Sequence, residues 1–388
     1  MALDSEAKRI SEATGKWAEV QPNAYTKRSK YSKHLKEYFE LFGRENILLI
    51  IRSIHSDMEE KNTSTVKNWK PPCVGVGTWQ FGSKEGEYWG ERKQEDINAI
   101  VREAVRNGKV MFDTAEAYNA GRSEECIAQA LSKCTKEEVS NAVLASKILP
   151  QNCKNVRTHL EATLKRLQID AIDLYQIHWP IPSEDVKAVF SELAALQKEG
   201  KIVHIGVSNF GVKQLQEALA TGVKIATNQM CYNLITRGIE FEVLPLCLKH
   251  NIGIICYSPL NQGLLTDKYS GVKSFDEIDP HRCRTRHFAG TRKMSRHNGQ
   301  GHEKLLQKTL IEIRKIASST GMSVEKLSLA WSASKSGIVS VIPGARNVPQ
   351  LRSNIDALQT RLSADVMKSL DAATNELKLA MGKALDVY

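Results

Sequence analysis

The sequence lacks long hydrophobic runs. The nearest candidate for a membrane-spanning helix, ILLIIRSI at 47–54, is well short of the roughly 18 apolar residues that a span requires. Over its 388 residues the chain is 41% apolar, with a mean hydropathy of −0.35. We therefore expect a globular protein without a membrane span.

Paired cysteines are also missing. The eight cysteines include no C-x-x-C pair and no zinc-binding spacing, so we expect reduced thiols and no metal site. The N-terminus has no apolar segment typical of a secretory signal, and acidic residues stand at positions 4, 6, 12 and 19, which transit peptides avoid. A cytoplasmic protein is predicted; delivery to a plastid or another organelle through the N-terminal region is the alternative.

One stretch has no acidic residues at all. Between positions 281 and 302 there are six Arg or Lys, four His and no Asp or Glu, within a chain of net charge +10. Such a stretch attracts nucleic acid, a membrane surface or a phosphorylated small molecule, or it is simply a solvated loop. Phe288 is its single aromatic residue, which disfavours nucleic-acid binding by base stacking.

A regular alternation of short apolar runs and amphipathic segments begins at about residue 73. The apolar runs span 73–79, 110–115, 142–148, 171–178, 202–209, 225–232, 252–260 and 338–345. Between them lie helix-like segments such as SEDVKAVFSELAALQKEG, with apolar residues at the spacing of one buried face. This pattern predicts a (β/α)8 TIM barrel. A doubly wound open sheet is the alternative, but its G-x-G-x-x-G turn is missing.

Two regions interrupt this alternation. Residues 1–70 precede the first strand and are predicted to form an N-terminal extension that is partly helical or mobile. The barrel is predicted to span 71–388, with a long loop at 261–300 after strand seven.

Polar residues follow the predicted strands where an active site would lie. Asp113 and Tyr118 follow strand two, Lys147 ends strand three and His178 ends strand four. Asp113 would compensate the buried Lys147, and the ammonium is expected to lower the pKa of Tyr118 from about 10. Tyr118 could then give a proton to a carbonyl oxygen. Such a step is productive when a hydride reaches the carbonyl carbon, which implies a nicotinamide cofactor.

The motifs around these residues resemble those of the aldo-keto reductases. FDTAEAYNAGRSEE, LKRLQIDAIDLYQIHWP, GKIVHIGVSNF, NQMCYN, YSPLNQGLLTDKY and IPGARNVPQLRSN occur in the order and at the spacing of that family, from about 74 to 357. The resemblance implies a catalytic tetrad of Asp113, Tyr118, Lys147 and His178, with Tyr118 as proton donor. It implies contacts to NADP(H) from Gly77, Thr78, Ser208, Asn209, Gln229, Tyr257, Ser258, Leu260, Lys268, Gly344, Arg346, Gln350 and Asn354. Trp79 and Trp179 would form walls of an apolar substrate pocket.

The phosphate end of this implied site favours NADPH over NADH. The Pro-Gly turn before the last helix offers backbone N–H groups, and Arg346 can grip a 2′-phosphate. Two positions depart from the family pattern: Gly344 stands where a lysine is common, and Ser353 where a glutamate is common. Arg346 is therefore expected to carry more of the phosphate contact. The basic stretch 281–302 follows strand seven and is predicted to close over the dinucleotide.

These features predict an NADPH-dependent reductase of aldehydes or ketones, with a small-molecule carbonyl substrate and no nucleic-acid partner. The alternative is an NADPH-binding, redox-sensing regulatory subunit, the role of the related β-subunits of potassium channels. That branch tends to lack the IHWP sequence that carries His178 and Trp179 here. Neither the substrate nor the oligomeric state follows from the sequence, although a monomer is favoured.

Overall fold

A computed structural model describes residues 69–269, 274–279 and 283–385 of the chain. The predictions made for the N-terminal extension therefore lie outside the described residues, apart from Trp69 and Lys70. The segments 270–273 and 280–282, which belong to the long loop after strand seven, also lie outside.

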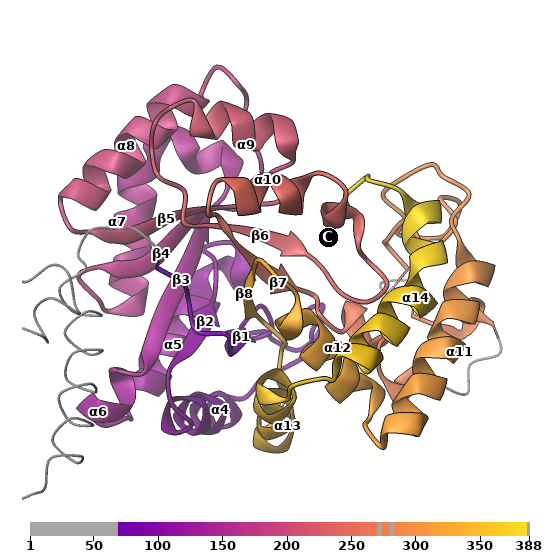
Figure 1. The fold of residues 1–388 in the computed structure, drawn as a ribbon. Coiled ribbons are helices and arrows are strands. Elements are labelled where there is room, and N and C mark those ends of the chain that lie inside the picture. Colours follow the sequence, from indigo (N-terminus) through magenta and orange to yellow (C-terminus); the bar gives the residue numbers. More distant parts are fainter. Residues whose placement is uncertain (1–68, 270–273, 280–282, 386–388) are drawn as a thin grey trace, which may run out of the picture. The chain divides into compact units, whose positions relative to one another are not determined.

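Eight parallel strands form the centre of the described structure and pair in chain order (Figure 1). The strands are β1 (Gly75–Gly77), β2 (Val110–Asp113), β3 (Ala142–Ile148), β4 (Ile172–Ile177), β5 (Ile202–Ser208), β6 (Thr227–Cys231), β7 (Gly253–Tyr257) and β8 (Ile338–Val341). Bridges from Val74 to Val341 and from Gly77 to Gly344 join the first strand to the last. The predicted (β/α)8 barrel is confirmed.

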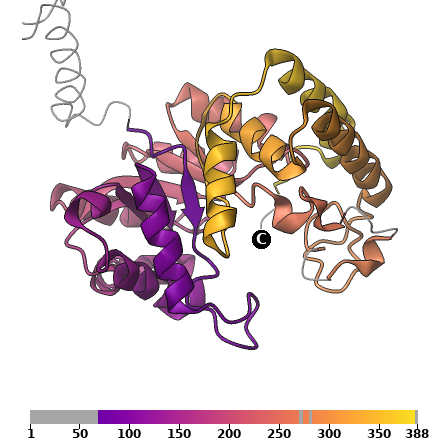
Figure 2. The ribbon, with the colours of Figure 1, turned by 90° about the horizontal axis from the view of Figure 1, so that it is seen from below.

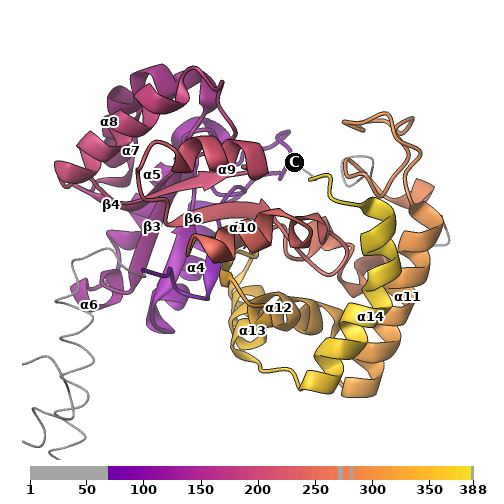
Figure 3. The same ribbon diagram turned by 45° about the horizontal axis from the view of Figure 1, so that its top comes forward.

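Helices follow the strands and surround them (Figures 1 and 3). They are α4 (Gln94–Arg106), α5 (Arg122–Leu131), α6 (Lys136–Val139), α7 (Val156–Leu167), α8 (Val186–Lys198), α9 (Val212–Leu219), α10 (Val243–Lys249), α11 (Glu303–Thr320), α12 (Val324–Ser334), α13 (Val348–Gln359) and α14 (Ala364–Met381). The helices α11 and α14 lie side by side in Figures 1 and 3.

The apolar face predicted for the segment after β4 is the face that α8 buries. Its five buried residues are Val186, Val189, Phe190, Leu193 and Leu196. They pack with the outward-facing side chains of the strands in one large core. Each side chain of this size stabilises the fold by about 1.5–3 kcal/mol when it is fully buried.

Barrel closure depends on the two glycines of β1. A Cβ atom at Gly75 would overlap the Ile342 side chain, and one at Gly77 would lie 3.0 Å from the Ile342 carbonyl oxygen. The absence of side chains lets the first strand approach the last closely enough for Gly77 N–H to donate to the Pro343 carbonyl at 3.2 Å. The cofactor contact predicted at Gly77 therefore lies at the seam of the barrel.

The barrel interior is apolar towards its N-terminal end and polar towards its C-terminal end. Met111, Ala145, Leu174 and Ile255 form an inner cluster against which Trp69 packs. Two residues further along β2 and β3, on the same inward face, stand Asp113 and Lys147. The polar residues thus gather at the end where parallel barrels build their active sites.

Candidate active site

Lys147 is fully buried in β3, and the surrounding residues use all of its hydrogen-bonding capacity. Its ammonium donates to Asp113 Oδ2 at 2.7 Å, to the Thr114 carbonyl at 2.8 Å and to Tyr118 Oη at 3.0 Å. A lysine has three N–H donors, so each has an acceptor. The cost of burying the charge is offset by a carboxylate and two further oxygens.

The partner carboxylate is held from two sides. Besides the bond from Lys147, Asp113 accepts at Oδ1 from Gln229 Nε2 at 2.6 Å. Burial alone would lower the pKa of Lys147. The charge of Asp113 and the hydrogen bonds to the side chains of Asp113 and Tyr118 raise this pKa above its usual value. The lysine therefore stays charged across the physiological range.

The prediction that the pKa of Tyr118 falls below its usual value of about 10 is wrong for this structure. Burial raises that pKa, and the charge of Asp113 adds to the increase, while Lys147 opposes it. The nearby ion pair has almost no net charge, so the ammonium does not outweigh the loss of solvent around the phenol. Tyr118 consequently keeps its proton at neutral pH, as a proton donor must.

His178 lines the same site and is neutral. Burial, together with the positive charge of Lys147, lowers its pKa well below 6.5. Its Nδ1 atom is buried and has no hydrogen-bond partner among the described residues. The ring lies 5.7 Å from the Tyr118 ring, edge to face. A neutral imidazole can orient a carbonyl group by hydrogen bonding, but it is not an acid at neutral pH.

An unusual backbone follows Tyr118. Asn119, Ala120 and Gly121 all have positive φ angles, of 51°, 57° and 87°, a conformation that costs free energy for the two non-glycine residues. The Asn119 side chain compensates by donating to the Trp79 and Phe81 carbonyls at 2.9 and 2.6 Å. It ties the loop of the tyrosine to the loop after β1, a role that the sequence analysis missed.

A cavity of about 880 Å³ opens beside Tyr118, towards the upper end of the about 300–1,000 Å³ typical of ligand sites. Lys147 lies behind its wall, whereas the other three tetrad residues line it. All thirteen residues predicted to contact a cofactor line it as well: Gly77, Thr78, Ser208, Asn209, Gln229, Tyr257, Ser258, Leu260, Lys268, Gly344, Arg346, Gln350 and Asn354. Both predicted substrate walls, Trp79 and Trp179, belong to the lining.

Amide and hydroxyl groups meet at the end of the cavity near the tetrad. Ser208 Oγ donates to the Gln229 carbonyl at 3.0 Å, and Asn209 Nδ2 donates to the His178 carbonyl at 3.1 Å. Tyr257 Oη donates to Asn209 Oδ1 at 2.8 Å. These bonds join the ends of β5, β6 and β7 in a fixed arrangement of polar groups.

The other end of the cavity is formed by the loop after β8 and the start of α13. Asn347 caps this helix by accepting from Gln350 N–H at 2.9 Å, and Gln350 Oε1 accepts from Arg346 N–H at 2.9 Å. Asn354 Nδ2 donates to the Gly344 carbonyl at 3.2 Å. Ser353, at one of the departures from the family pattern, also lines the cavity.

The loop between β1 and α4 adds an aromatic wall that the sequence analysis missed. Trp89 lines the cavity and lies edge to face with Trp79 at 5.1 Å. Tyr88 stacks on Trp79 at 5.5 Å and donates from its hydroxyl to Gln262 Oε1 at 3.1 Å. The adjacent aromatics in the glycine-rich segment GSKEGEYWGE were the available signal. A loop has no periodicity from which their direction could be predicted.

The basic stretch contacts the rest of the protein at several points. None of its described residues, 283–302, lines the cavity. His287 is buried and contacts the Ile235 carbonyl through Nε2 at 2.7 Å. Arg292 forms ion pairs with Asp276 and Glu303 at 2.8 and 2.5 Å. Arg284 reaches the aromatic wall, with its guanidinium carbon 5.2 Å from the centre of the Tyr88 ring. Closure of the stretch over a dinucleotide stays a prediction.

Comparisons with known proteins agree with this geometry. The family model described as "Aldo/keto reductase family" matches residues 73–375, more than three quarters of the chain. The chain belongs to the aldo/keto reductase family. It is therefore an oxidoreductase, as the sequence predicted. Among the described residues, no helix is long and apolar enough to cross a membrane.

Named relatives are similar in sequence to this aldo/keto reductase over most of its length. The chain is 31% identical to the methylglyoxal reductase YeaE of Escherichia coli, an alignment that covers 78% of this chain and 90% of the relative. It is 32% identical to an oxidoreductase of Mycobacterium tuberculosis, over 80% and 92% of the two chains.

Solved structures of the family are similar as well. An aldo-keto reductase of Klebsiella pneumoniae in complex with NADPH has a TM-score of 0.61 at 26% identity, over 82% of this chain and 95% of that one. The glycerol dehydrogenase of Gluconobacter oxydans has a TM-score of 0.64 at 27% identity, over 78% and 91%.

Proposed function

We propose that this aldo/keto reductase reduces aldehydes or ketones to alcohols with NADPH, and that Tyr118 is the proton donor. The observation that carries the proposal is that all three N–H groups of Lys147 already have acceptors. Because its third N–H donates to Tyr118 Oη, the phenol accepts from the lysine and keeps its own proton for a group in the cavity. The lysine also stabilises the phenolate that forms once the proton is transferred.

The residues of the cavity fit a nicotinamide dinucleotide. Ser208, Asn209 and Gln229 supply amide and hydroxyl groups near Tyr118, where a carboxamide could bind. Lys268, Arg346 and the N-terminal end of α13 supply positive charge further along, which suits phosphate groups. A bound NADPH supplies the hydride that reduces the carbonyl carbon.

The protein contributes two side chains beside the carbonyl group, those of His178 and Tyr118. Neutral His178 orients the carbonyl by donating a hydrogen bond to its oxygen, and Tyr118 gives the oxygen its proton. Trp79, Trp89 and Trp179 exclude water and favour an apolar substituent on the substrate. Since similar proteins carry the name methylglyoxal reductase, small aldehydes and 2-oxoaldehydes belong in the first substrate panel beside aromatic aldehydes.

A redox-sensing regulatory subunit is the second candidate function. It would bind NADPH without needing a complete proton-donating site. The presence of His178 and Trp179 in the cavity lining beside Tyr118 favours the enzyme.

The decisive experiment compares the wild type with Tyr118→Phe. NADPH oxidation is followed with the panel of aldehydes and ketones, and NADPH binding is measured separately. We expect the variant to keep its affinity for NADPH and to lose about 10²- to 10⁴-fold in turnover, the usual contribution of a general acid. If both proteins bind NADPH tightly and neither turns over any carbonyl, the regulatory function replaces the enzymatic one.

A further inference from the structure

Glu116 joins the loop after β2 to the segments that follow β3. Its Oε1 atom accepts from the Leu149 backbone N–H and from Asn152 Nδ2, both at 2.8 Å. Its Oε2 atom lies 2.7 Å from Nδ1 of His159, in α7. The Glu116 side chain is 7% exposed and does not line the cavity. Its carboxylate thus holds the loop after β2, the turn after β3 and α7 together.

These contacts lie on either side of the two residues that would donate and stabilise the proton. Glu116 stands two residues before Tyr118, and Leu149 stands two residues after Lys147. The Glu116 backbone N–H also donates to the Lys147 carbonyl at 3.3 Å, which continues the parallel pairing of β2 and β3 beyond Asp113. A backbone bond at Lys147 and a side-chain bond at Leu149 therefore fix the loop after β2 against the end of β3.

Tyr118 needs such support, because it lies in a loop whereas Lys147 lies in a strand. The strand is held by its neighbours in the sheet on both sides. The loop has positive φ angles at Asn119 and Ala120, a conformation that persists only where the surrounding contacts fix it. Beyond Tyr118, Asn119 attaches it to the loop between β1 and α4, drawn in indigo in Figure 2. Before Tyr118, Glu116 attaches it to the segments after β3.

We propose that Glu116 is a positioning residue for proton donation, which holds the Tyr118 hydroxyl within hydrogen-bonding distance of the Lys147 ammonium. The two atoms lie 3.0 Å apart. The inference rests on the proposed function, since it assumes that Tyr118 is the proton donor. None of the three residues that bind the Glu116 carboxylate is among those predicted to contact NADPH, so its loss should affect turnover and not cofactor binding.

The test compares kcat and the dissociation constant for NADPH in the wild type, Glu116→Ala and Glu116→Gln. Because a displacement of about 1 Å can cost about 100-fold in rate, we expect Glu116→Ala to lower kcat by about 10- to 100-fold. Its NADPH binding should be unchanged. Glu116→Gln keeps an oxygen for Leu149 and Asn152 and an amide group for His159, so it should retain most of the wild-type kcat.

Asp173→Ala is the matched control. Asp173 also accepts from a backbone N–H of β3, that of Leu144 at 2.8 Å, but this bond lies towards the N-terminal end of the strand. Both alanine variants should lower the free energy of unfolding, and only Glu116→Ala should lower kcat. If Glu116→Ala fails to fold, Asn152→Ala takes its place. This variant removes one donor to the carboxylate, and we expect a smaller loss of kcat.

Two kinetic results would overturn this inference. One is an unchanged kcat in Glu116→Ala, or in Asn152→Ala where that variant takes its place. The other is an equal loss of kcat in Asp173→Ala, since a general loss of stability would then explain both effects.

A crystal structure of the same variant gives an answer that does not depend on turnover. We expect Tyr118 Oη to lie beyond hydrogen-bonding distance of Lys147 Nζ, and an unchanged distance would contradict the inference. If the wild type reduces no carbonyl, the proposed function fails, whereas this distance still decides whether Glu116 positions Tyr118.

Discussion

At the scale of single residues, the site depends on one buried ion pair. Removing either partner of such a pair leaves an uncompensated charge, which costs about 3–5 kcal/mol. Here the pair also serves chemistry, because Lys147 donates to Tyr118 as well as to Asp113. Gln229 completes the arrangement by occupying the second oxygen of Asp113. The cluster is therefore both a stabilising network and the proposed proton-donating machinery.

The pKa directions at the site predict how reduction depends on pH. Tyr118 has a raised pKa and stays protonated until the pH exceeds the usual tyrosine value of about 10. His178 has a strongly lowered pKa and stays neutral through the range in which an ordinary histidine titrates, near 6.5. We expect kcat for carbonyl reduction to be flat from about pH 6 to pH 9 and to fall only above it. An inflection near pH 6.5 that disappears in His178→Gln would contradict this assignment.

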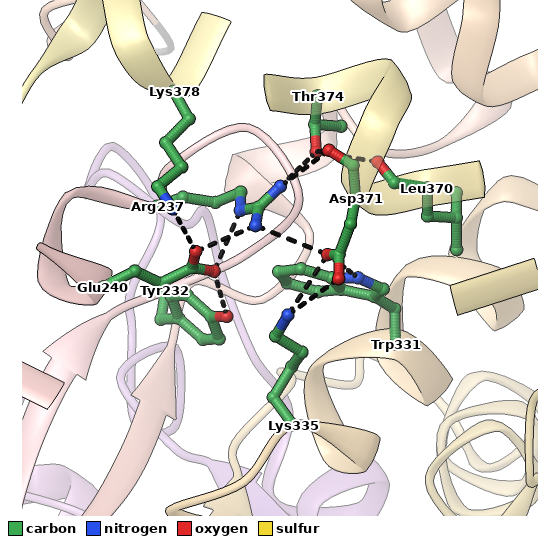
Figure 4. Close-up of polar contacts among 9 residues, drawn as sticks. All are labelled: Tyr232, Arg237, Glu240, Trp331, Lys335, Leu370, Asp371, Thr374 and Lys378. Carbon is green, nitrogen blue, oxygen red and sulfur yellow. Dashed lines mark hydrogen bonds and ion pairs between the residues drawn. The ribbon is translucent and has the colours of Figure 1, made fainter. Parts of the chain in front are cut away.

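At the scale of elements, a buried polar network attaches α14 to the barrel (Figure 4). Glu240, in the loop after β6, accepts from Arg237 at 2.8 Å, from Lys378 at 2.7 Å and from Tyr232 at 2.6 Å. Asp371 of α14 accepts from Lys335 at 3.0 Å and from the Trp331 indole at 3.0 Å. These bonds reach from the segment after β6 to the last helix.

The network predicts a contribution to acid stability. Burial would raise the pKa of Glu240, but the hydrogen bonds from its three partners lower it from 4.5 to about 2. The folded state therefore gains stability on the order of 3 kcal/mol above pH 4.5, which is lost as the pH falls from 4.5 towards 2. We expect Glu240→Gln to reduce the free energy of unfolding by about 3 kcal/mol at pH 7 and to flatten its decline in acid.

Urea unfolding at several pH values measures this effect. The matched control is Glu376→Gln on α14, which removes an exposed ion pair with Lys308 of α11 and should change the free energy of unfolding by less than about 1 kcal/mol. Equal destabilisation by the two variants would show that the network around Glu240 contributes no more to the free energy of unfolding than an exposed ion pair does.

At the scale of the whole barrel, the N-terminal end of the strands contributes to stability and not to the active site. Trp69 stacks on His204 with ring centroids 4.0 Å apart, near the N-terminal end of the strands. His204 is 8% exposed, and burial, with a smaller effect of Lys224, lowers its pKa from 6.5 to about 4. The active site lies at the C-terminal end. Changes at His204 should therefore alter stability and leave turnover unchanged.

The lowered pKa of His204 predicts a second pH range in which the stability of the fold changes. As the pH falls from 6.5 to 4, the unfolded chain binds a proton at His204 that the folded chain does not bind, so the stability declines by up to about 3 kcal/mol. We expect His204→Phe, which keeps an aromatic ring against Trp69, to remove the part of the decline that His204 contributes. The part contributed by His178, whose pKa burial also lowers, should remain. The measurement is the free energy of unfolding at pH 7 and pH 5 in both proteins, with kcat as a check. A wild-type decline that persists unchanged in the variant would exclude His204 as its source.

The sequence by itself determined the barrel, its strand order and the polar residues at the strand ends. Strands buried on both faces have near-continuous apolar runs, and an interruption such as Lys147 therefore stands out against its neighbours. The parallel arrangement brings all strand ends to one side, so the side chains of Asp113, Lys147 and His178 could be placed together without knowing any side-chain contact. The assignment of residues as distant as Thr78 and Asn354 to one cofactor site came from the resemblance to the aldo-keto reductases.

Only the tertiary structure decided the electrostatic balance and the contacts between loops. The pKa of Tyr118 depends on how burial, Asp113 and Lys147 combine, and solvent exclusion is a property of the packed fold. Loops have no repeating pattern. The sequence therefore could not predict the aromatic wall at Trp89, the bonds of Asn119 or the internal contacts of the basic stretch. Each depends on which distant segments pack together, and that is determined by the whole barrel.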